Sequence, residues 1–163
     1  MAKHPSPQHL DRVIAVDPGE KTGIAIWECS AQVLSAQVLS VSDTVEFFLG
    51  QLAKGTEDVW VVVEKFTITA QTGKMSTLGL NWPLELTGVA RAVAQHNDWA
   101  FDNSQGPAAA KRFSPDERLK AAGWWDKLRA AETGPEDHAR DAARHLLLAL
   151  CESKLMDVPR IGG

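Results

Sequence analysis

The chain has 163 residues, of which 44% are hydrophobic and 23% charged, and its formal net charge is −4 at pH 7. This length predicts one compact domain with a single core, and the composition is typical of a soluble globular protein without the apolar run of roughly 20 residues that a membrane helix needs. The acidic balance argues against a protein that coats nucleic acid non-specifically, so any DNA affinity would require a local basic surface.

The N-terminal residues 1–12 are polar, include Pro5 and Pro7, and lack the apolar core of a signal peptide. We therefore expect a flexible arm here, a single domain over residues 13–152 and a tail over residues 153–163. The only two cysteines are expected to be reduced. Together these features predict a cytoplasmic protein.

The first predicted element is a β-hairpin with strands at about 13–17 and 23–29. Four apolar residues end on Asp17, a Pro-Gly turn follows, and a second apolar run starts after Thr22 and Gly23. The hairpin would hold Asp17 at the end of a strand. Aspartate is common in turns, so taken alone Asp17 could be an ordinary turn residue.

A strand, a helix and a second strand are expected next. Residues 32–41 are rich in β-branched and apolar side chains and predict an edge strand. Ser42 is the expected N-cap of a helix that Gly55 ends. The strand predicted over 59–64 is apolar on both faces and should lie centrally in the sheet. It ends on Glu64, which could also be a surface acid at a strand end.

Residues 66–81 lose periodicity and fill with polar side chains, which predicts a long loop of the kind that is usually functional or disordered. A helix follows over about 84–97, with small residues suited to close packing, and residues 99–101 predict a short strand. The remainder of the chain is expected to be helical.

Two short helices are expected over residues 108–131, with breaks near Ser114-Pro115 and Gly123. The last helix should start near Pro135-Glu136, because proline suits the first turn of a helix. The predicted order is three strands, then helices that alternate with two further strands, and finally consecutive helices. This order predicts a mixed α/β or α+β layer fold.

His138 and Asp141 lie three residues apart near the start of the last predicted helix, a spacing that puts them on one face. With Asp17 and Glu64, three acids thus come from distant segments, each at the edge of a hydrophobic element. Carboxylates are the ligands that Mg²⁺ prefers, so a divalent-cation site for phosphate chemistry is predicted. Alone, His138 and Asp141 could be a solvated first helical turn. His145 is interpreted as structural or exposed.

These motifs resemble those of the RuvC family of Holliday junction resolvases over about residues 13–150. The resemblance rests on Asp17-Pro18-Gly19 with Thr22-Gly23, on Glu64 at a strand end, and on His138-Ala139-Arg140-Asp141-Ala142. Among them, the chain looks most like the short members encoded by bacteriophages. The resemblance implies an RNase H-like five-stranded mixed sheet flanked by helices, a homodimer, and Mg²⁺-dependent cutting of four-way DNA junctions.

The resemblance also implies roles for the site residues. Asp17 matches the acid of the first strand, Glu64 that of the fourth strand, and Asp141 that of the last helix. His138 matches a position one turn earlier where family members have Asp or His, and because Asp137 adjoins it, either side chain could face the metals. In a two-metal site Asp17 would bridge both Mg²⁺ ions and Glu64 would hold one. Asp141 with His138 would hold the other, and Mn²⁺ could replace Mg²⁺; His138 could instead orient or deprotonate the attacking water.

Candidate DNA contacts are cationic or aromatic side chains in the middle of the chain: Phe66, Lys74, Lys111, Arg112 and Lys120. Phosphate contacts need only positive charge within reach, and these basic residues could equally be a solvated helical face. Some family members place an aromatic that probes the junction centre near the position of Phe66, although a Phe just past a central strand is usually core. The helix 84–97 resembles the one that forms the dimer seam.

The function that these patterns favour is a metal-dependent, structure-selective endonuclease that resolves four-way junctions and acts on other branched DNA. Two alternatives stay open: an RNA-processing nuclease of the same kind, and a branched-DNA-binding protein that does not cleave. An actin-like ATPase or sugar kinase also places a phosphate loop after a first-strand acid. Those proteins need two such lobes, which 163 residues cannot supply.

Overall fold

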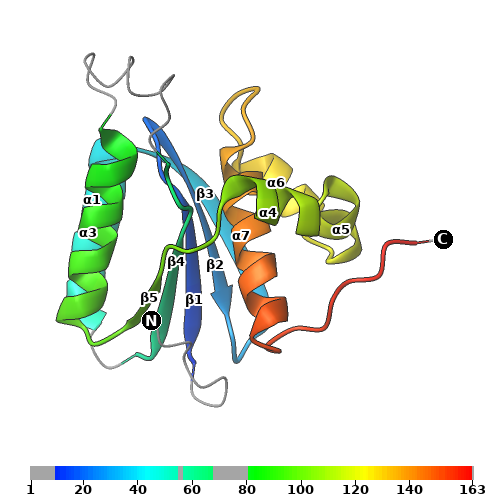
Figure 1. The fold of residues 1–163 in the computed structure, drawn as a ribbon, viewed down its shortest axis with the longest axis horizontal. Coiled ribbons are helices and arrows are strands. Elements are labelled where there is room, and N and C mark those ends of the chain that lie inside the picture. Colours follow the sequence, from blue (N-terminus) through cyan, green and yellow to red (C-terminus); the bar gives the residue numbers. More distant parts are fainter. Residues whose placement is uncertain (1–9, 55–56, 68–80, 163) are drawn as a thin grey trace.

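The computed structural model describes residues 10–54, 57–67 and 81–162. Its centre is a five-stranded mixed sheet with helices on both faces (Figure 1), the α/β architecture predicted from the sequence. The strands are β1 (Arg12–Asp17), β2 (Lys21–Glu28), β3 (Val33–Ser40), β4 (Val59–Val63) and β5 (Ala100–Asp102). The helices are α1 (Val41–Gln51), the 3₁₀ turn η1 (Leu52–Lys54), α3 (Trp82–His96), α4 (Pro107–Phe113), α5 (Asp116–Ala121), α6 (Trp125–Ala131) and α7 (His138–Glu152). None of the described helices combines the length and apolarity needed to cross a membrane.

The strand order across the sheet is β3-β2-β1-β4-β5. The hairpin β1–β2 and the pair β2–β3 are antiparallel, whereas β4 runs parallel to both β1 and β5. β3 lies at an edge and β4 is flanked on both sides with every residue buried, as their sequences predict. The parallel pair β1–β4 therefore forms the centre of the sheet.

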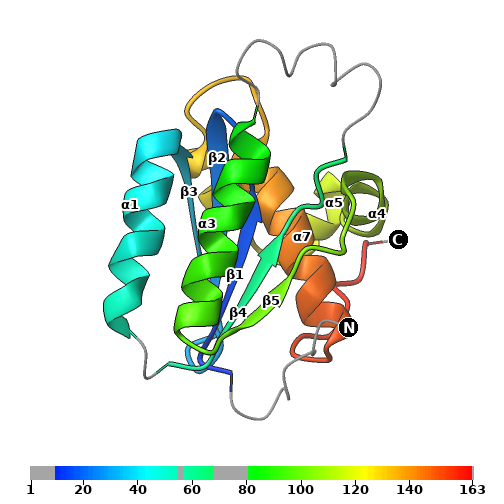
Figure 2. The same cartoon turned by 60° about the vertical axis from the view of Figure 1, so that its left-hand side comes forward.

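The two faces of the sheet belong to two separate apolar clusters. In β1, Val13 and Ala15 pack in the cluster that contains the alanines and leucines of α7, while Ile14 and Val16 pack with Phe48 of α1 and with α3. Figures 1 and 2 show α1 and α3 side by side on one face and α7, covered by α4–α6, on the other. The alternation of a strand thus decides which helix layer each side chain meets.

The start of α1 differs from the sequence prediction. The helix begins at Val41 and its N-cap is Ser40, two residues before the predicted cap Ser42. The backbone N–H of Asp43 donates to Ser40 Oγ over 3.2 Å, whereas Ser42 Oγ lies beside Ser40 Oγ. A serine at position 40 or 42 could cap the helix, and Ser40 does so because β3 ends there. The predicted helix end at Gly55 lies outside the described residues.

The start of α7 also lies later than predicted, at His138 rather than near Pro135-Glu136. Asp137 is the N-cap, and its carbonyl accepts the first helical hydrogen bond, from the backbone N–H of Asp141 over 2.7 Å. The proline precedes the helix in a bend instead of standing in its first turn. His138 and Asp141 consequently lie in the first turn of α7.

Three short helices, not two, occupy the segment 108–131. Both predicted breaks are present: Ser114 and Pro115 separate α4 from α5, and Gly123 separates α5 from α6 with a positive φ of 73°. Two breaks divide the segment into three helices, so the predicted number of two was wrong. In the predicted 66–81 loop, residues 68–80 lie outside the described part of the chain.

The close approach of α7 to the sheet depends on Gly23 in β2. A Cβ atom at Gly23 would lie 1.9 Å from the carbonyl oxygen of His138, a distance that no real contact reaches. Gly23 is also the residue paired with Asp17 across the hairpin. The missing side chain therefore lets the first turn of α7 lie directly beside the end of β1.

We predict that Gly23→Ala lowers the free energy of unfolding by about 1–3 kcal/mol, because the new methyl group displaces the first turn of α7. The control is Gly50→Ala in α1, where an added Cβ meets nothing within 4 Å and should be neutral or stabilising by up to about 1 kcal/mol. Urea unfolding of both variants measures the difference. Equal stability of the two variants would contradict the proposed close packing.

Candidate active site

Two acids stand at neighbouring strand ends in the centre of the sheet. Asp17 is the last residue of β1 and Glu64 directly follows β4. The parallel register pairs Val16 with Val63, and the backbone N–H of Glu64 donates to the carbonyl of Val16 over 2.9 Å. The ladder therefore carries Glu64 to the level of Asp17.

Both acids also lie on the same face of the sheet. Side chains two residues apart in a strand share a face. Asp17 follows Ala15 by two residues and Glu64 follows Val62 by two, and both of these apolar residues belong to the α7-facing cluster. The carboxyl groups are thus directed to the layer that contains α7.

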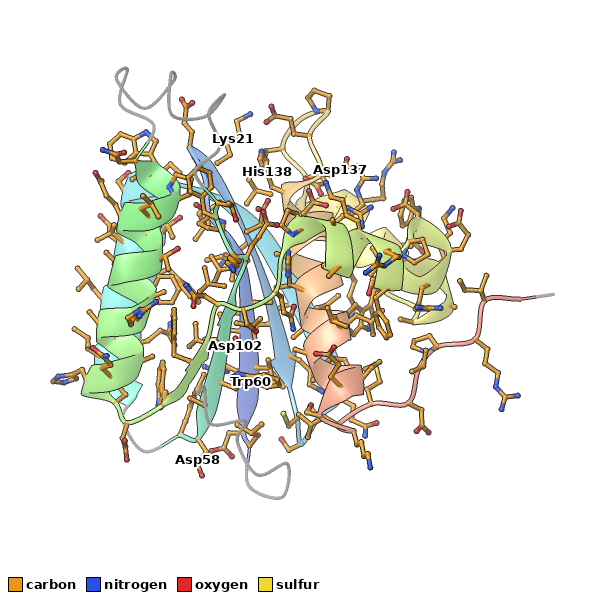
Figure 3. The ribbon with its side chains drawn as sticks, viewed as in Figure 1. Lys21, Asp58, Trp60, Asp102, Asp137 and His138 are labelled. Atoms are coloured by element: carbon orange, nitrogen blue, oxygen red, sulfur yellow. The ribbon has the colours of Figure 1, made fainter. Side chains whose placement is uncertain are left out.

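The first turn of α7 brings His138 to Asp17. The Nδ1 atom of His138 lies 3.3 Å from Asp17 Oδ2, and its Nε2 atom lies 2.9 Å from Glu136 Oε2. Asp137 instead pairs with Arg140. Figure 3 places His138 and Asp137 together at the end of α7 nearest the hairpin tip. Of these two adjacent residues, His138 is the one in contact with a strand-end acid.

The three predicted acids lie within range of one another's charges. Burial raises the pKa of Asp17 above its ordinary value, and the negative charges of Glu64 and Asp141 raise this pKa further. The hydrogen bond from His138 acts in the opposite direction but does not cancel the increase. Neighbouring like charges make ionisation unfavourable, so the arrangement favours any cation that can enter it.

Each of the other two acids has its own positively charged or hydrogen-bonding partner. His145 Nε2 lies 2.8 Å from Glu64 Oε2. Asp141 pairs with Lys111 Nζ over 3.1 Å and with the guanidinium of Arg144. The acids are therefore tied to side chains of α4 and α7.

Sequence reasoning missed His145, Arg144 and Gln105 as members of this region. His145 is buried and lies one turn after Asp141 in α7, so the i, i+4 spacing was the available signal. Arg144 is buried and also pairs with Asp116 of α5. Gln105 follows β5 in a turn, and no pattern in the sequence links it to the acids.

The donors present suit a hard divalent cation by their chemistry. Carboxylate oxygens of Asp17, Glu64 and Asp141 are the ligands that Mg²⁺ prefers, and their mutual repulsion would be relieved by a cation. Within residues 10–54, 57–67 and 81–162, however, no three His, Cys, Asp or Glu side chains are already arranged to hold a metal. The acids would have to exchange some of their present partners to do so.

One of the predicted DNA contacts, Lys111, lies beside the acids. Lys111 and Arg112 occupy the last turn of α4. Lys111 is 56% exposed while its ammonium group contacts Asp141, and Arg112 is exposed. The structure thus brings an exposed cation from a distant segment to Asp141.

The other predicted contacts are more scattered. Lys120 of α5 lies over the ring of Trp125, with Nζ 4.5 Å from the ring centroid. Phe66 is half-buried in the segment that follows β4. Lys74 lies outside the described residues. The assignment of these residues to DNA binding stays a prediction.

Comparisons with known proteins identify the fold. No family model and no curated protein sequence matches the chain. Among solved structures it resembles Thermus thermophilus RuvC in complex with a Holliday junction substrate, at 16% identity and a TM-score of 0.57, over 88% of this chain and 96% of that one. A second Thermus thermophilus RuvC structure matches at 19% identity and a TM-score of 0.49 over the same shares. The chain has the RNase H-like fold.

We predict that the His138–Asp17 contact stabilises the metal-free protein below neutral pH and not at high pH. The hydrogen bond to Asp17 raises the pKa of His138 from 6.5 to about 9, with a further contribution from Glu136. A raised pKa means that the stabilisation is fully present below about pH 6.5 and is lost as pH rises through about 9. The stability difference between wild type and His138→Gln should therefore shrink over this window.

Urea unfolding in chelator at several pH values measures that difference, with His96→Gln at the exposed end of α3 as the control. A difference for His138→Gln that stays constant or grows between pH 6 and pH 10 would contradict the assigned pairing.

Proposed function

We propose that this protein is a metal-dependent, structure-selective DNA endonuclease that resolves four-way junctions and acts on other branched DNA. The observation that carries the proposal is the convergence of Asp17, Glu64 and Asp141 from β1, β4 and α7. The fold supports it, because it resembles a RuvC structure solved with a Holliday junction substrate. The motif resemblance of the sequence to the RuvC family, and to its short phage-encoded members, supports it independently.

Asp17 is the residue best placed to lie between two cations, because it interacts with both of the other acids. Glu64 would hold one cation, and Asp141 with His138 the other. Two Mg²⁺ or Mn²⁺ ions, when bound, would neutralise the phosphate and activate a water. His138 is protonated at neutral pH in its present contacts, so it must release that proton before its ring nitrogen can act as a ligand or accept a proton from water.

Lys111 is the DNA contact that the geometry supports best. Its ammonium group now neutralises Asp141, and its side chain is more than half exposed. If Asp141 takes up a cation, Lys111 becomes available to a phosphate of the same DNA strand. Arg112, Lys120, Phe66 and Lys74 extend the proposed DNA surface.

We further propose that the protein acts as a homodimer. A two-fold dimer with one site per subunit suits two symmetric nicks in a four-way junction. The face of α3 turned away from the sheet is the proposed seam. Leu84 is exposed on this helix, and a Cβ at Gly88 would meet nothing within 4 Å in the described chain.

The decisive experiment incubates the protein with labelled synthetic substrates and Mg²⁺, Mn²⁺ or chelator. We expect cleavage of the four-way junction by the wild type and none by Asp17→Asn, Glu64→Gln or Asp141→Asn, because each variant removes a charged oxygen ligand. Junction binding should stay within a few-fold of wild type. Glu46→Gln, an exposed acid of α1 on the opposite face of the sheet, is the matched control and should cleave normally.

Each outcome of this experiment selects one function. A variant of the three acids that retains normal turnover removes that residue from the site. Cleavage of an RNA precursor in place of the junction supports the RNA-processing nuclease. Junction binding by the wild type without any cleavage supports the non-cleaving binding protein.

We also predict that Mg²⁺ raises the melting temperature of the protein. A ligand that binds only the folded state stabilises it by mass action. In chelator above about pH 9, where His138 no longer pairs with Asp17 as a cation, Asp17→Asn should melt at least as high as wild type, because burial and repulsion disfavour the Asp17 charge. With Mg²⁺ the order should reverse. Thermal unfolding that is the same with and without Mg²⁺ would argue against a cation site.

A further inference from the structure

His145 of α7 is a buried histidine that the proposed mechanism does not use. It is only 1% exposed, and both ring nitrogens have partners. Nε2 lies 2.8 Å from Glu64 Oε2, and Nδ1 lies 3.1 Å from Gln105 Oε1. The ring thus connects one of the three acids to the segment that follows β5.

Gln105, the second partner of His145, is also connected to the chain beside Glu64. Gln105 is itself 8% exposed, and its backbone carbonyl accepts a hydrogen bond of 2.8 Å from the N–H of Lys65. Lys65 is the residue directly after Glu64. The contacts therefore form a closed circuit through Glu64, His145, Gln105 and Lys65, which ties the end of β4 to α7 from two sides.

The hydrogen-bonding chemistry determines how the ring acts on Glu64. A carboxylate can only accept, so the Nε2–H of His145 donates to Oε2. The side-chain amide of Gln105, which can present its oxygen or its NH₂ group, meets the other ring nitrogen and fixes the ring orientation. In the described part of the chain, Glu64 Oε1 takes part in no hydrogen bond or ion pair.

We propose that His145 is a positioning residue for Glu64, which it holds by Oε2 so that Oε1 is kept for a divalent cation. The inference rests on the proposed function, since it concerns a ligand of the proposed metal site. A histidine that served only the packing of α7 would not need hydrogen bonds both to Glu64 and to Gln105, which itself binds the residue after Glu64. Loss of a side chain that orients a metal ligand typically weakens metal affinity or activity by about 10- to 100-fold.

The test measures Mn²⁺ binding to the full chain by calorimetry, without DNA, and compares substitutions at residue 145. His145→Leu removes both hydrogen bonds at similar volume and should weaken Mn²⁺ binding by about 10- to 100-fold. His145→Gln keeps an N–H donor near the position of Nε2 and should recover most of the affinity. In cleavage assays His145→Leu should need a correspondingly higher metal concentration, with a rate at saturating metal within a few-fold of wild type.

Two comparisons separate positioning from simple stability. Leu147→Ala, a fully buried residue of the same helix in the α7-facing core, should lose thermal stability without changing Mn²⁺ affinity. In a Glu64→Gln background, His145→Leu should change the remaining Mn²⁺ affinity by less than about twofold, because a residue that acts through Glu64 has no further effect once Glu64 is gone.

The outcomes distinguish this inference from the proposed function. Normal Mn²⁺ binding by both wild type and His145→Leu would overturn the positioning role and leave the nuclease proposal intact. Equal, additive losses with and without Glu64 would overturn it as well. A wild-type protein that binds no Mn²⁺ would overturn the metal site and, with it, this role of His145.

Discussion

The mutual repulsion of three carboxylates is the constraint that this end of the molecule must satisfy. Burial and the charges of Glu64 and Asp141 raise the pKa of Asp17, so the protein gives up stability to keep the acids together. It limits the cost by giving each acid a donor or cation: His138 for Asp17, His145 for Glu64, and α4 and α7 cations for Asp141. A cluster that is costly to maintain and has no apolar packing role is typical of a functional site.

Much of this arrangement follows from local sequence rules. Apolar runs that end on Asp17 and Glu64 predict two strands, and the period of two then determines which face each acid takes. The three-residue spacing of His138 and Asp141 predicts their shared position in a helix. The hairpin sequence does not reveal that Gly23 is required for the contact with α7. A side chain at this position becomes a steric problem only once the helix packs on the strand.

The failures have a common physical origin in choices that tertiary contacts decide. Either of two serines could cap α1, and Ser40 does so because β3 ends there. Pro135 could have stood in a first helical turn, but α7 starts at His138, where this side chain meets Asp17 at the end of β1. His145 looked structural or exposed because its partner, Glu64, lies 81 residues away in the chain. No local pattern contains such a pairing.

The three acids differ in how easily their present partners can leave, and this difference suggests how the site would open. His145 is buried in the core and cannot withdraw without moving α7, so Glu64 would be the fixed ligand of the proposed metal site. Lys111 is 56% exposed and can swing into solvent, and the His138 side chain is 25% exposed. A cation or a phosphate would therefore exchange first with the partners of Asp141 and Asp17. The rigid half of the site belongs to the sheet, and the exchangeable half lies where α4 and the first turn of α7 face the surface.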